Sequence, residues 1–392
     1  MPNAGNHSKT AATVLAHAGF VITGVMTTLL GPMLPVLSAR WSLNDAQAGH
    51  LFTAQFATSI LGVGLSTLLS RRFEYRMPLL LGQIFFALGV GLLAQANWAV
   101  GVFSICIYGF GQGVTIPASN LLISDLNPQS RAAALNLLNF SWGIGAVGCP
   151  FAIAALQPSH RIHLFLYGIA VSALTLAAIL GSLSLGTGGR TAGTASGKTE
   201  LRFWTGRLVI VLGLLFFIYV GVENAVGGWI SSYARRVASD PGTFWAMTPS
   251  FFWGALLAGR ALAPLLLRRA RETTVAIAGL SLATTAVLLL MAAHRMQLIF
   301  LAASLGGLGL SAVFPITVAM IPLWLGKAGE RAAGVMFALS SMGGATLPWL
   351  VGVISDRFHN LAIGLGVPLF GSLVMLGLYV ANRNSRADAA AA

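Results

Sequence analysis

A series of long apolar runs, each long enough to cross a lipid bilayer, constrains this chain more than any other feature. A spanning helix needs about 20 mostly apolar residues. Twelve runs meet this requirement: 12–37, 46–69, 77–96, 98–123, 132–156, 162–185, 206–233, 245–267, 273–293, 296–321, 331–354 and 361–381. Because a chain in lipid must satisfy its own backbone hydrogen bonds, the runs predict an all-α membrane protein with twelve transmembrane helices.

The composition supports a membrane protein and argues against several other classes. Hydrophobic residues make up 56% of the chain and charged residues only 8%, whereas a soluble domain has roughly a quarter charged residues. The net charge of +13 would suggest nucleic acid in a soluble protein, but here the basic residues lie in short loops between apolar runs. We therefore expect the lipid bilayer, and no nucleic acid, as a partner.

Motifs for catalysis or for cofactor binding are missing from the sequence. The two cysteines, Cys106 and Cys149, both lie in predicted spans, so they provide neither a disulfide framework nor a metal cluster. No P-loop, dinucleotide fingerprint, zinc spacing or nucleophile motif occurs. We expect no enzyme, no cofactor and no metal site, and we expect the protein to be monomeric.

One polar interruption divides the chain into two halves. Residues 186–202 are rich in glycine, serine and threonine and carry basic residues, which is typical of a linker. Six predicted spans lie on each side. This predicts two pseudo-symmetric six-helix bundles, 1–185 and 205–392, joined by a cytoplasmic linker, 186–204.

The distribution of basic residues predicts the orientation. With both termini in the cytoplasm, sixteen lysines and arginines lie on that side and six outside, while Arg260, the remaining one of the 23, lies within a span. Basic residues prefer cytoplasmic loops, so we expect a multi-pass protein of the plasma or inner membrane with both ends inside. Pro315 and Pro322 interrupt the tenth run, but proline is tolerated in spans whose neighbours satisfy the freed carbonyls. A re-entrant segment is the alternative there.

Glu223 is the carboxylate placed deepest in a predicted span, with Asn224 beside it. Such a placement costs at least ~2.5–3.5 kcal/mol on insertion scales, so an acid at this depth usually marks a functional site. We expect Glu223 and Asn224 to bind a polar solute. The alternative is an acid that is protonated, or paired with one partner, and only locks two helices together.

Residues around Glu223 suggest how this helix could bind a solute. Three glycines lie close to Glu223: Gly221, Gly227 and Gly228. We expect them to let the helix bend or unwind, which would free backbone groups for a polar ligand. The indole of Trp229 would supply an apolar wall.

Neutral amides in the fourth and fifth spans are further candidates for solute binding. They are Gln112 and Asn120 in the fourth span and Asn136 and Asn139 in the fifth, followed by Trp142. An amide donates and accepts hydrogen bonds, as a hydroxyl does, so these side chains suit a hydroxyl-rich solute whose C–H surface would lie on the indole. The alternative is hydrogen bonding between helices, worth about 0.6 kcal/mol on average.

Three ionisable residues could have roles in coupling or gating. His17 lies near one end of the first span, where a solvated side chain is one interpretation and proton transfer another. Burial would favour a neutral Glu223, which could donate to a solute oxygen and could carry a coupled proton. Arg260 lies about nine residues before the arginines at 268–269, and we expect a gating or structural role for it.

Three passages resemble the Major Facilitator Superfamily and, within it, the fucose/glucose–proton symporter branch. They are PVLSARWSLNDAQAG at 35–49, GQGVTIPASNLLISDLNP at 111–128 together with LNLLNFSWGIGA at 135–146, and YVGVENAVGGWISSY at 219–233. The resemblance implies that Asn139 matches a sugar-binding amide, Asn120 an asparagine of the fourth span, and Glu223 and Trp229 a pair in the seventh.

The sequence departs from that branch at positions linked to proton coupling. Gly31 and Ile116 stand where the fucose symporters have acids, and Ser70 stands where the superfamily's loop motif usually has an aspartate. The departures leave the coupling ion, proton or sodium, and the identity of the solute open.

The leading hypothesis is a transporter for a small neutral hydroxylated solute, a hexose such as glucose. It would work by alternating access, as one half rocks against the other. It could be facilitative or coupled to an ion. An exporter of drugs or lipids and a sensor that binds solute without transport are the alternatives.

Overall fold

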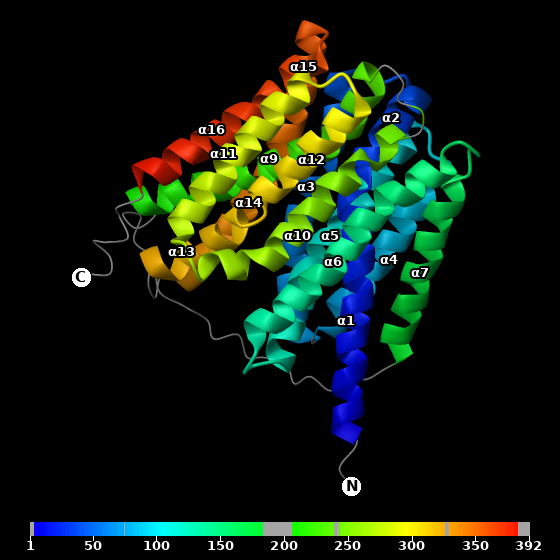
Figure 1. The fold of residues 1–392 in the computed structure, drawn as a ribbon. Coiled ribbons are helices and arrows are strands. Elements are labelled where there is room, and N and C mark those ends of the chain that lie inside the picture. Colours follow the sequence, from blue (N-terminus) through cyan, green and yellow to red (C-terminus); the bar gives the residue numbers. More distant parts are fainter. Residues whose placement is uncertain are drawn as a thin grey trace. The chain divides into compact units, whose positions relative to one another are not determined.

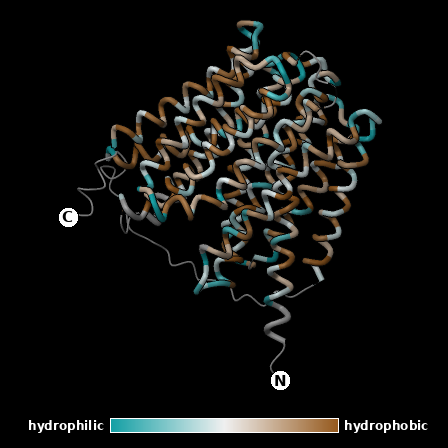
Figure 2. The backbone as a smooth tube through the Cα atoms, in the orientation of Figure 1, coloured by the Kyte–Doolittle hydropathy of each residue, from teal (hydrophilic) through white to brown (hydrophobic). Residues whose placement is uncertain are grey.

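The computed structural model describes residues 4–73, 75–182, 206–238, 242, 244–325 and 329–382 (Figure 1). Regular structure in these ranges is entirely helical. Twelve helical segments are long and apolar enough to span a membrane, which confirms the predicted number of spans. Apolar residues follow the helices and hydrophilic ones gather at turns and ends (Figure 2). The predicted linker, 186–204, lies outside the described residues.

Residues 1–33 and 54–193 form one compact unit, and residues 34–53 and 194–392 form the other. The units follow the two predicted halves except at 34–53, which group with the C-terminal residues. The helices of the first unit are α1 (Ala4–Thr28), most of α3 (Asp45–Arg72), α4 (Arg76–Leu93), α5 (Trp98–Leu126), α6 (Arg131–Leu156) and α7 (Ile162–Ser182).

The second unit contains most of α2 (Leu30–Trp41) and the first residues of α3. Its other helices are α9 (Arg207–Val237), η1 (Phe244–Met247), α10 (Thr248–Leu267), α11 (Glu272–Ala292), α12 (Met296–Leu310), α13 (Val313–Leu325), α14 (Gly329–Phe358), α15 (Leu361–Gly364) and α16 (Gly366–Ala381).

Close backbone contact holds α1 against α6 in the first unit. A Cβ atom at Gly24 would collide with the carbonyl oxygen of Trp142, and one at Gly145 with that of Val21. Both glycines are therefore required for the approach of the two helices. Small residues at the interface are the usual means of packing in lipid, where helices gain little from the hydrophobic effect.

Two predicted spans are interrupted helices. The first span turns at Leu29, between α1 and α2, and the tenth turns at Ser311–Ala312, between α12 and α13. Pro315 lies in the first turn of α13, where its missing N–H would have no helical partner in any case. The two pieces of the tenth span together cover the candidate membrane segment Met296–Ile321, as predicted for one span.

Helix α9 is the centre of the second unit and packs against α10, α13, α14 and α16. Every residue of α9 from Gly221 to Ala234 is buried. The expectation that glycines would bend or unwind this helix is wrong, because α9 is unbroken across 221–228. Gly227 and Gly228 instead make room for aromatic rings: a Cβ atom there would lie 2.6 Å from Trp253 and Phe52, respectively.

The start of α3 is fixed by a reciprocal cap and an ion pair. Asn44 Oδ1 accepts from the Gln47 N–H at 2.8 Å, and Gln47 Oε1 accepts from the Asn44 N–H at 3.1 Å, which is a capping-box arrangement. Asp45 accepts two bonds from Arg236 of α9, at 2.7 and 2.5 Å, and one from Ser355 of α14 at 2.5 Å. These contacts attach residues 34–53 to the C-terminal residues of the unit.

Replacing Asp45 by asparagine should lower the melting temperature of the detergent-solubilised protein. The change removes a bidentate ion pair and weakens the Ser355 bond, but the Arg236 side chain is 45% exposed, so the loss should be about 1 kcal/mol. Arg236→Gln should have a similar effect, and the double variant should be no worse than either single one. Asp356→Asn, which removes the same charge on α14, is the control; equal destabilisation by this control would contradict the assignment.

Candidate functional site

Glu223 lies in a cluster of three polar side chains in the interior of the second unit. Tyr219, one helical turn earlier on α9, donates its hydroxyl to Glu223 Oε1 at 3.1 Å. Arg260 of α10 places Nη2 3.2 Å from the same oxygen. The Glu223 and Arg260 side chains are 11% and 22% exposed, so this is a largely buried ion pair. The sequence analysis named both residues but did not pair them.

The tenth span is interrupted after α12, and the carbonyl at the end of α12 also contacts this cluster. The Tyr219 hydroxyl also lies 3.1 Å from the carbonyl oxygen of Leu310, the last residue of α12. The final carbonyls of a helix lack intrahelical partners, and the single hydroxyl proton of Tyr219 is shared between this carbonyl and Glu223 Oε1. Gly259, the neighbour of Arg260, permits the approach of α12, since a Cβ atom there would collide with Ser311.

The ion pair leaves hydrogen-bonding capacity unused on both partners. Tyr219 and Arg260 share Oε1, while no hydrogen bond from a described residue reaches Oε2 of Glu223. The Nε–H of Arg260 is buried and has no acceptor among the described residues. A carboxylate can accept several hydrogen bonds, so the cluster can still accept a bond from a hydroxyl at Oε2.

Asn224 and Trp229 lie on α9 but have different surroundings. Asn224 is 8% exposed and donates from Nδ2 to the carbonyl of Val220 at 2.9 Å. Trp229 is completely buried, donates from Nε1 to the carbonyl of Pro348 at 2.8 Å, and lies beside Phe52. This indole is a packing residue of the second unit, so we leave it out of the proposed site.

Gln112 of the first unit is tied to another helix. Its Oε1 accepts from Gln55 Nε2 at 2.9 Å, and both amides are buried. Gln55 Nε2 also lies 3.4 Å from the carbonyl oxygens of Met26 and Thr27. This network joins α1, α3 and α5, so the geometry favours interhelical bonding for Gln112. The sequence analysis considered Gln112 without Gln55, because the sequence does not show which helices face each other.

The asparagines at 139 and 120 are differently placed from Gln112. Each donates from Nδ2 to the carbonyl four residues earlier on its own helix, at 2.9 and 2.8 Å, and each is partly exposed. Among the described residues, nothing donates to their Oδ1 atoms. Asn136 is exposed one turn before Asn139 on α6. Asn139 and Asn120 therefore retain acceptors that a solute hydroxyl could use.

His17 and Trp142 connect α1 with α6. Nδ1 of His17 lies 2.7 Å from the hydroxyl oxygen of Ser141, and Nε1 of Trp142 donates to the hydroxyl of Thr27 at 3.4 Å. The histidine thus has a polar protein partner, and it is only partly exposed. The sequence analysis offered a solvated side chain as one interpretation of His17 and did not pair it with Ser141.

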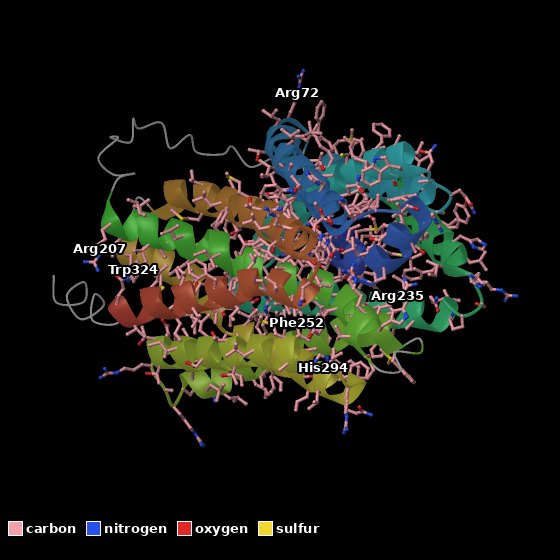
Figure 3. All side chains as sticks on the ribbon, turned by 90° about the horizontal axis from the view of Figure 1, so that it is seen from above. Arg72, Arg207, Arg235, Phe252, His294 and Trp324 are labelled. Carbon is pink, nitrogen blue, oxygen red and sulfur yellow. The ribbon has the colours of Figure 1, made fainter. Side chains whose placement is uncertain are left out.

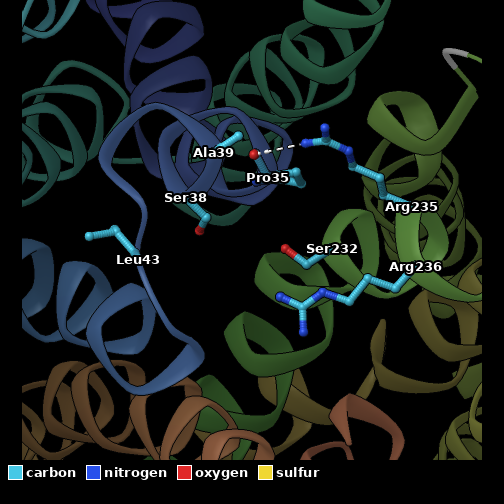
Figure 4. Close-up of a pocket in the computed structure, with 7 residues that line it drawn as sticks. All are labelled: Pro35, Ser38, Ala39, Leu43, Ser232, Arg235 and Arg236. Atoms are coloured by element: carbon cyan, nitrogen blue, oxygen red, sulfur yellow. Dashed lines mark hydrogen bonds between the residues drawn. The ribbon is translucent and has the colours of Figure 1, made fainter. Parts of the chain in front are cut away.

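A pocket in the second unit lies away from Glu223. Its volume is about 350 Å³, and it is lined by Pro35, Ser38, Ala39, Leu43, Ser232, Arg235 and Arg236. Arg235 donates to the carbonyl of Pro35 at 2.9 Å across it (Figure 4). Arg235 is twelve residues beyond Glu223, or about 18 Å along the helix. Arg207 and Arg235 lie toward opposite ends of α9 (Figure 3), with Glu223 between them in sequence.

Comparison with known proteins places the chain in a family. Residues 16–282, well over half of the chain, match the Major Facilitator Superfamily. The chain belongs to this superfamily. It is therefore a multi-pass membrane transporter rather than an enzyme. No group of three or more His, Cys, Asp or Glu side chains that could hold a metal ion occurs in the part of the chain that the structure describes.

Relatives with assigned names are similar over nearly the whole chain. The glucose/galactose transporter of Brucella abortus is 24% identical over 92% of this chain and 91% of its own. The sodium-dependent glucose transporter 1A of Mus musculus is 22% identical over 93% and 95%. The glucose/mannose transporter GlcP of Bacillus subtilis is 20% identical over 96% and 95%.

Solved structures show the same fold at low sequence identity. The nucleoside transporter NupG superposes with a TM-score of 0.77 at 13% identity, over 95% of this chain and 99% of its own. A D-xylose-proton symporter gives 0.73 at 16%, over 93% and 96%. The E. coli fucose:proton symporter FucP gives 0.63 at 18%, over 95% and 98%. These likenesses confirm the predicted twelve-helix transporter fold.

Replacing Gln112 by alanine should destabilise the protein. The change leaves the buried Nε2 of Gln55 without its best acceptor, a loss of about 1–3 kcal/mol. Asn139→Ala removes only a bond within its own helix turn and should leave the melting temperature nearly unchanged. Thermal unfolding of the two purified variants checks this, and an unaltered Gln112→Ala protein would return Gln112 to the list of solute-binding candidates.

Proposed function

We propose that this protein transports a neutral hexose, with D-glucose as the first candidate, by alternating access. The observation that carries the proposal is Glu223, a buried carboxylate at the centre of α9 whose Oε2 is unused by the described residues. The relatives named as glucose transporters, which match over nine-tenths of the chain, support the same solute class.

The chemistry of the remaining candidates also suits hydroxyl groups. Asn224 belongs to the second unit, and Asn120 and Asn139 belong to the first; each donates to its own helix and retains an acceptor oxygen. In the proposed function Asn139 binds a sugar hydroxyl and Trp142 offers an apolar face to its C–H groups. Several amides whose oxygens receive no bond from a described residue suit a hydroxylated solute better than an apolar drug or lipid, which offers few hydrogen-bond donors.

Counterflow in proteoliposomes tests the proposed function. Vesicles loaded with unlabelled D-glucose should transiently accumulate labelled D-glucose from outside, and galactose or mannose should compete if the site accepts hexoses broadly. Binding of glucose without counterflow would indicate a sensor. Counterflow of lipophilic cations in place of sugars would indicate an exporter and contradict the proposal.

Asn139→Ala should weaken glucose binding without loss of expression or stability. A lost hydrogen bond to a buried hydroxyl costs about 1–3 kcal/mol, so the dissociation constant should rise at least several-fold. The matched control is Asn127→Ala. Asn127 makes the same kind of bond to the carbonyl four residues earlier but follows the end of α5. Equal affinities in wild type and Asn139→Ala would remove Asn139 from the site.

We further propose that both termini and the 186–202 segment face the cytoplasm of a cell whose plasma or inner membrane holds the protein. The support is the sixteen-to-six distribution of basic residues. In a background with Cys106 and Cys149 replaced by alanine, Ser159→Cys should react with an impermeant maleimide added to intact cells. Ser196→Cys should react only after permeabilisation; the opposite pattern would reverse the topology.

A further inference from the structure

Arg260 and Tyr219 both contact the same carboxylate oxygen of Glu223, so its two oxygens have different surroundings. Both side chains reach Oε1, at 3.2 and 3.1 Å, and no described residue donates to Oε2. A purely structural ion pair in an apolar interior is stable only when its remaining hydrogen-bonding capacity is satisfied. Here the buried Nε–H of Arg260 has no acceptor among the described residues. No described residue donates to Oε2 of Glu223, whose side chain is 11% exposed. A role limited to locking α9 to α10 does not account for this arrangement.

Among the described residues, one positive charge and no second acid interact with Glu223. Burial disfavours the ionised form of Glu223, whereas the Arg260 cation and the Tyr219 hydroxyl beside the carboxylate favour it, and arginine remains protonated in proteins. The described titratable groups that reach Glu223 are Tyr219 on its own helix and Arg260 on α10. The described contact between α12 and this cluster is the Leu310 carbonyl, which is linked to Glu223 through the Tyr219 hydroxyl. α13 and α16 have no charged residue, and those of α14 lie near its ends.

We propose that Arg260 is a positioning residue that keeps Glu223 ionised and turned with Oε2 toward the solute, so that Glu223 accepts a hydroxyl bond and does not carry a coupled proton. The identity of the solute in this inference rests on the proposed function. The charge state assigned to Glu223 is independent of the proposed function. It replaces the sequence-based expectation of a neutral acid that donates. Tyr219 is assigned a supporting role, because its hydroxyl fixes Oε1 and also bonds to the end of α12.

Carbodiimide labelling tests the charge state without any sugar. Dicyclohexylcarbodiimide enters the membrane and reacts with protonated carboxyl groups in apolar surroundings. In wild-type proteoliposomes between pH 6 and 8, peptide mass spectrometry should find no adduct on Glu223. Arg260→Gln should acquire the adduct, most strongly at low pH, while Arg260→Lys and the control Arg268→Gln, at the exposed end of α10, should not. An adduct on wild-type Glu223 at pH 7 would overturn the proposal even if the Arg260 variants failed to fold.

Transport measurements test the positioning role. Glu223→Gln and Arg260→Gln should each raise the KM for D-glucose at least tenfold, and the double variant should be no worse, because the two side chains act as one unit. Wild-type KM should be flat from pH 6 to 8. In Arg260→Gln it should fall as pH rises, since the unpaired acid accepts a hydroxyl bond only after losing its proton.

Two further outcomes are decisive. A Glu223→Gln variant that loses proton-driven accumulation but keeps wild-type glucose exchange would show that Glu223 carries the proton, and would overturn the inference. Absence of hexose counterflow in wild type, with the labelling pattern as expected, would contradict the proposed function and leave the Arg260–Glu223 assignment standing.

Discussion

A charge placed inside an apolar bundle must be stabilised by a partner, and in this protein that partner decides what the carboxylate can do. Glu223 and Arg260 come from the neighbouring helices α9 and α10. Tyr219 contacts both Glu223 and the end of α12, which lies close to α10 because residue 259 is glycine. The Coulomb attraction between the two groups is strong in such a medium, while the cost of removing both from water is also large. In our proposal the pair has a function that accounts for this cost, because Oε2, which receives no bond from a described residue, accepts a hydroxyl of the solute.

Helix α9 carries this cluster and also much of the packing of the second unit. The same helix buries Trp229 against Phe52 and binds Asp45 through Arg236 near its C-terminal end. Glycines on α9 and α14 allow close contact, since a Cβ atom at Gly343 would collide with the carbonyl of Phe217. A continuous helix therefore supports Glu223, and in our proposal the oxygen that binds the solute is oriented by neighbouring side chains and not by unwound backbone.

Polar side chains of the first unit divide into two classes by their partners. Gln55 and Gln112 bond to each other across helices, whereas Asn120 and Asn139 bond only to their own helix and retain acceptors. The difference matters because an amide already used between helices has less to offer a solute. It also explains why residue type alone is a poor guide to a binding site in a membrane protein.

The sequence by itself determined the twelve spans, the family and the depth of Glu223, because hydropathy over 20 residues and the cost of a buried charge are local properties of the chain. The i, i+4 spacing of Tyr219 and Glu223 was also readable, although it was not used. Only the tertiary structure decided that Arg260 is the partner of Glu223, that Gln55 holds Gln112, that Trp229 is a packing residue and that Asp45 joins α3 to α9 and α14. Each of these depends on which helix faces the residue, and that is set by the contacts of segments far apart in the chain.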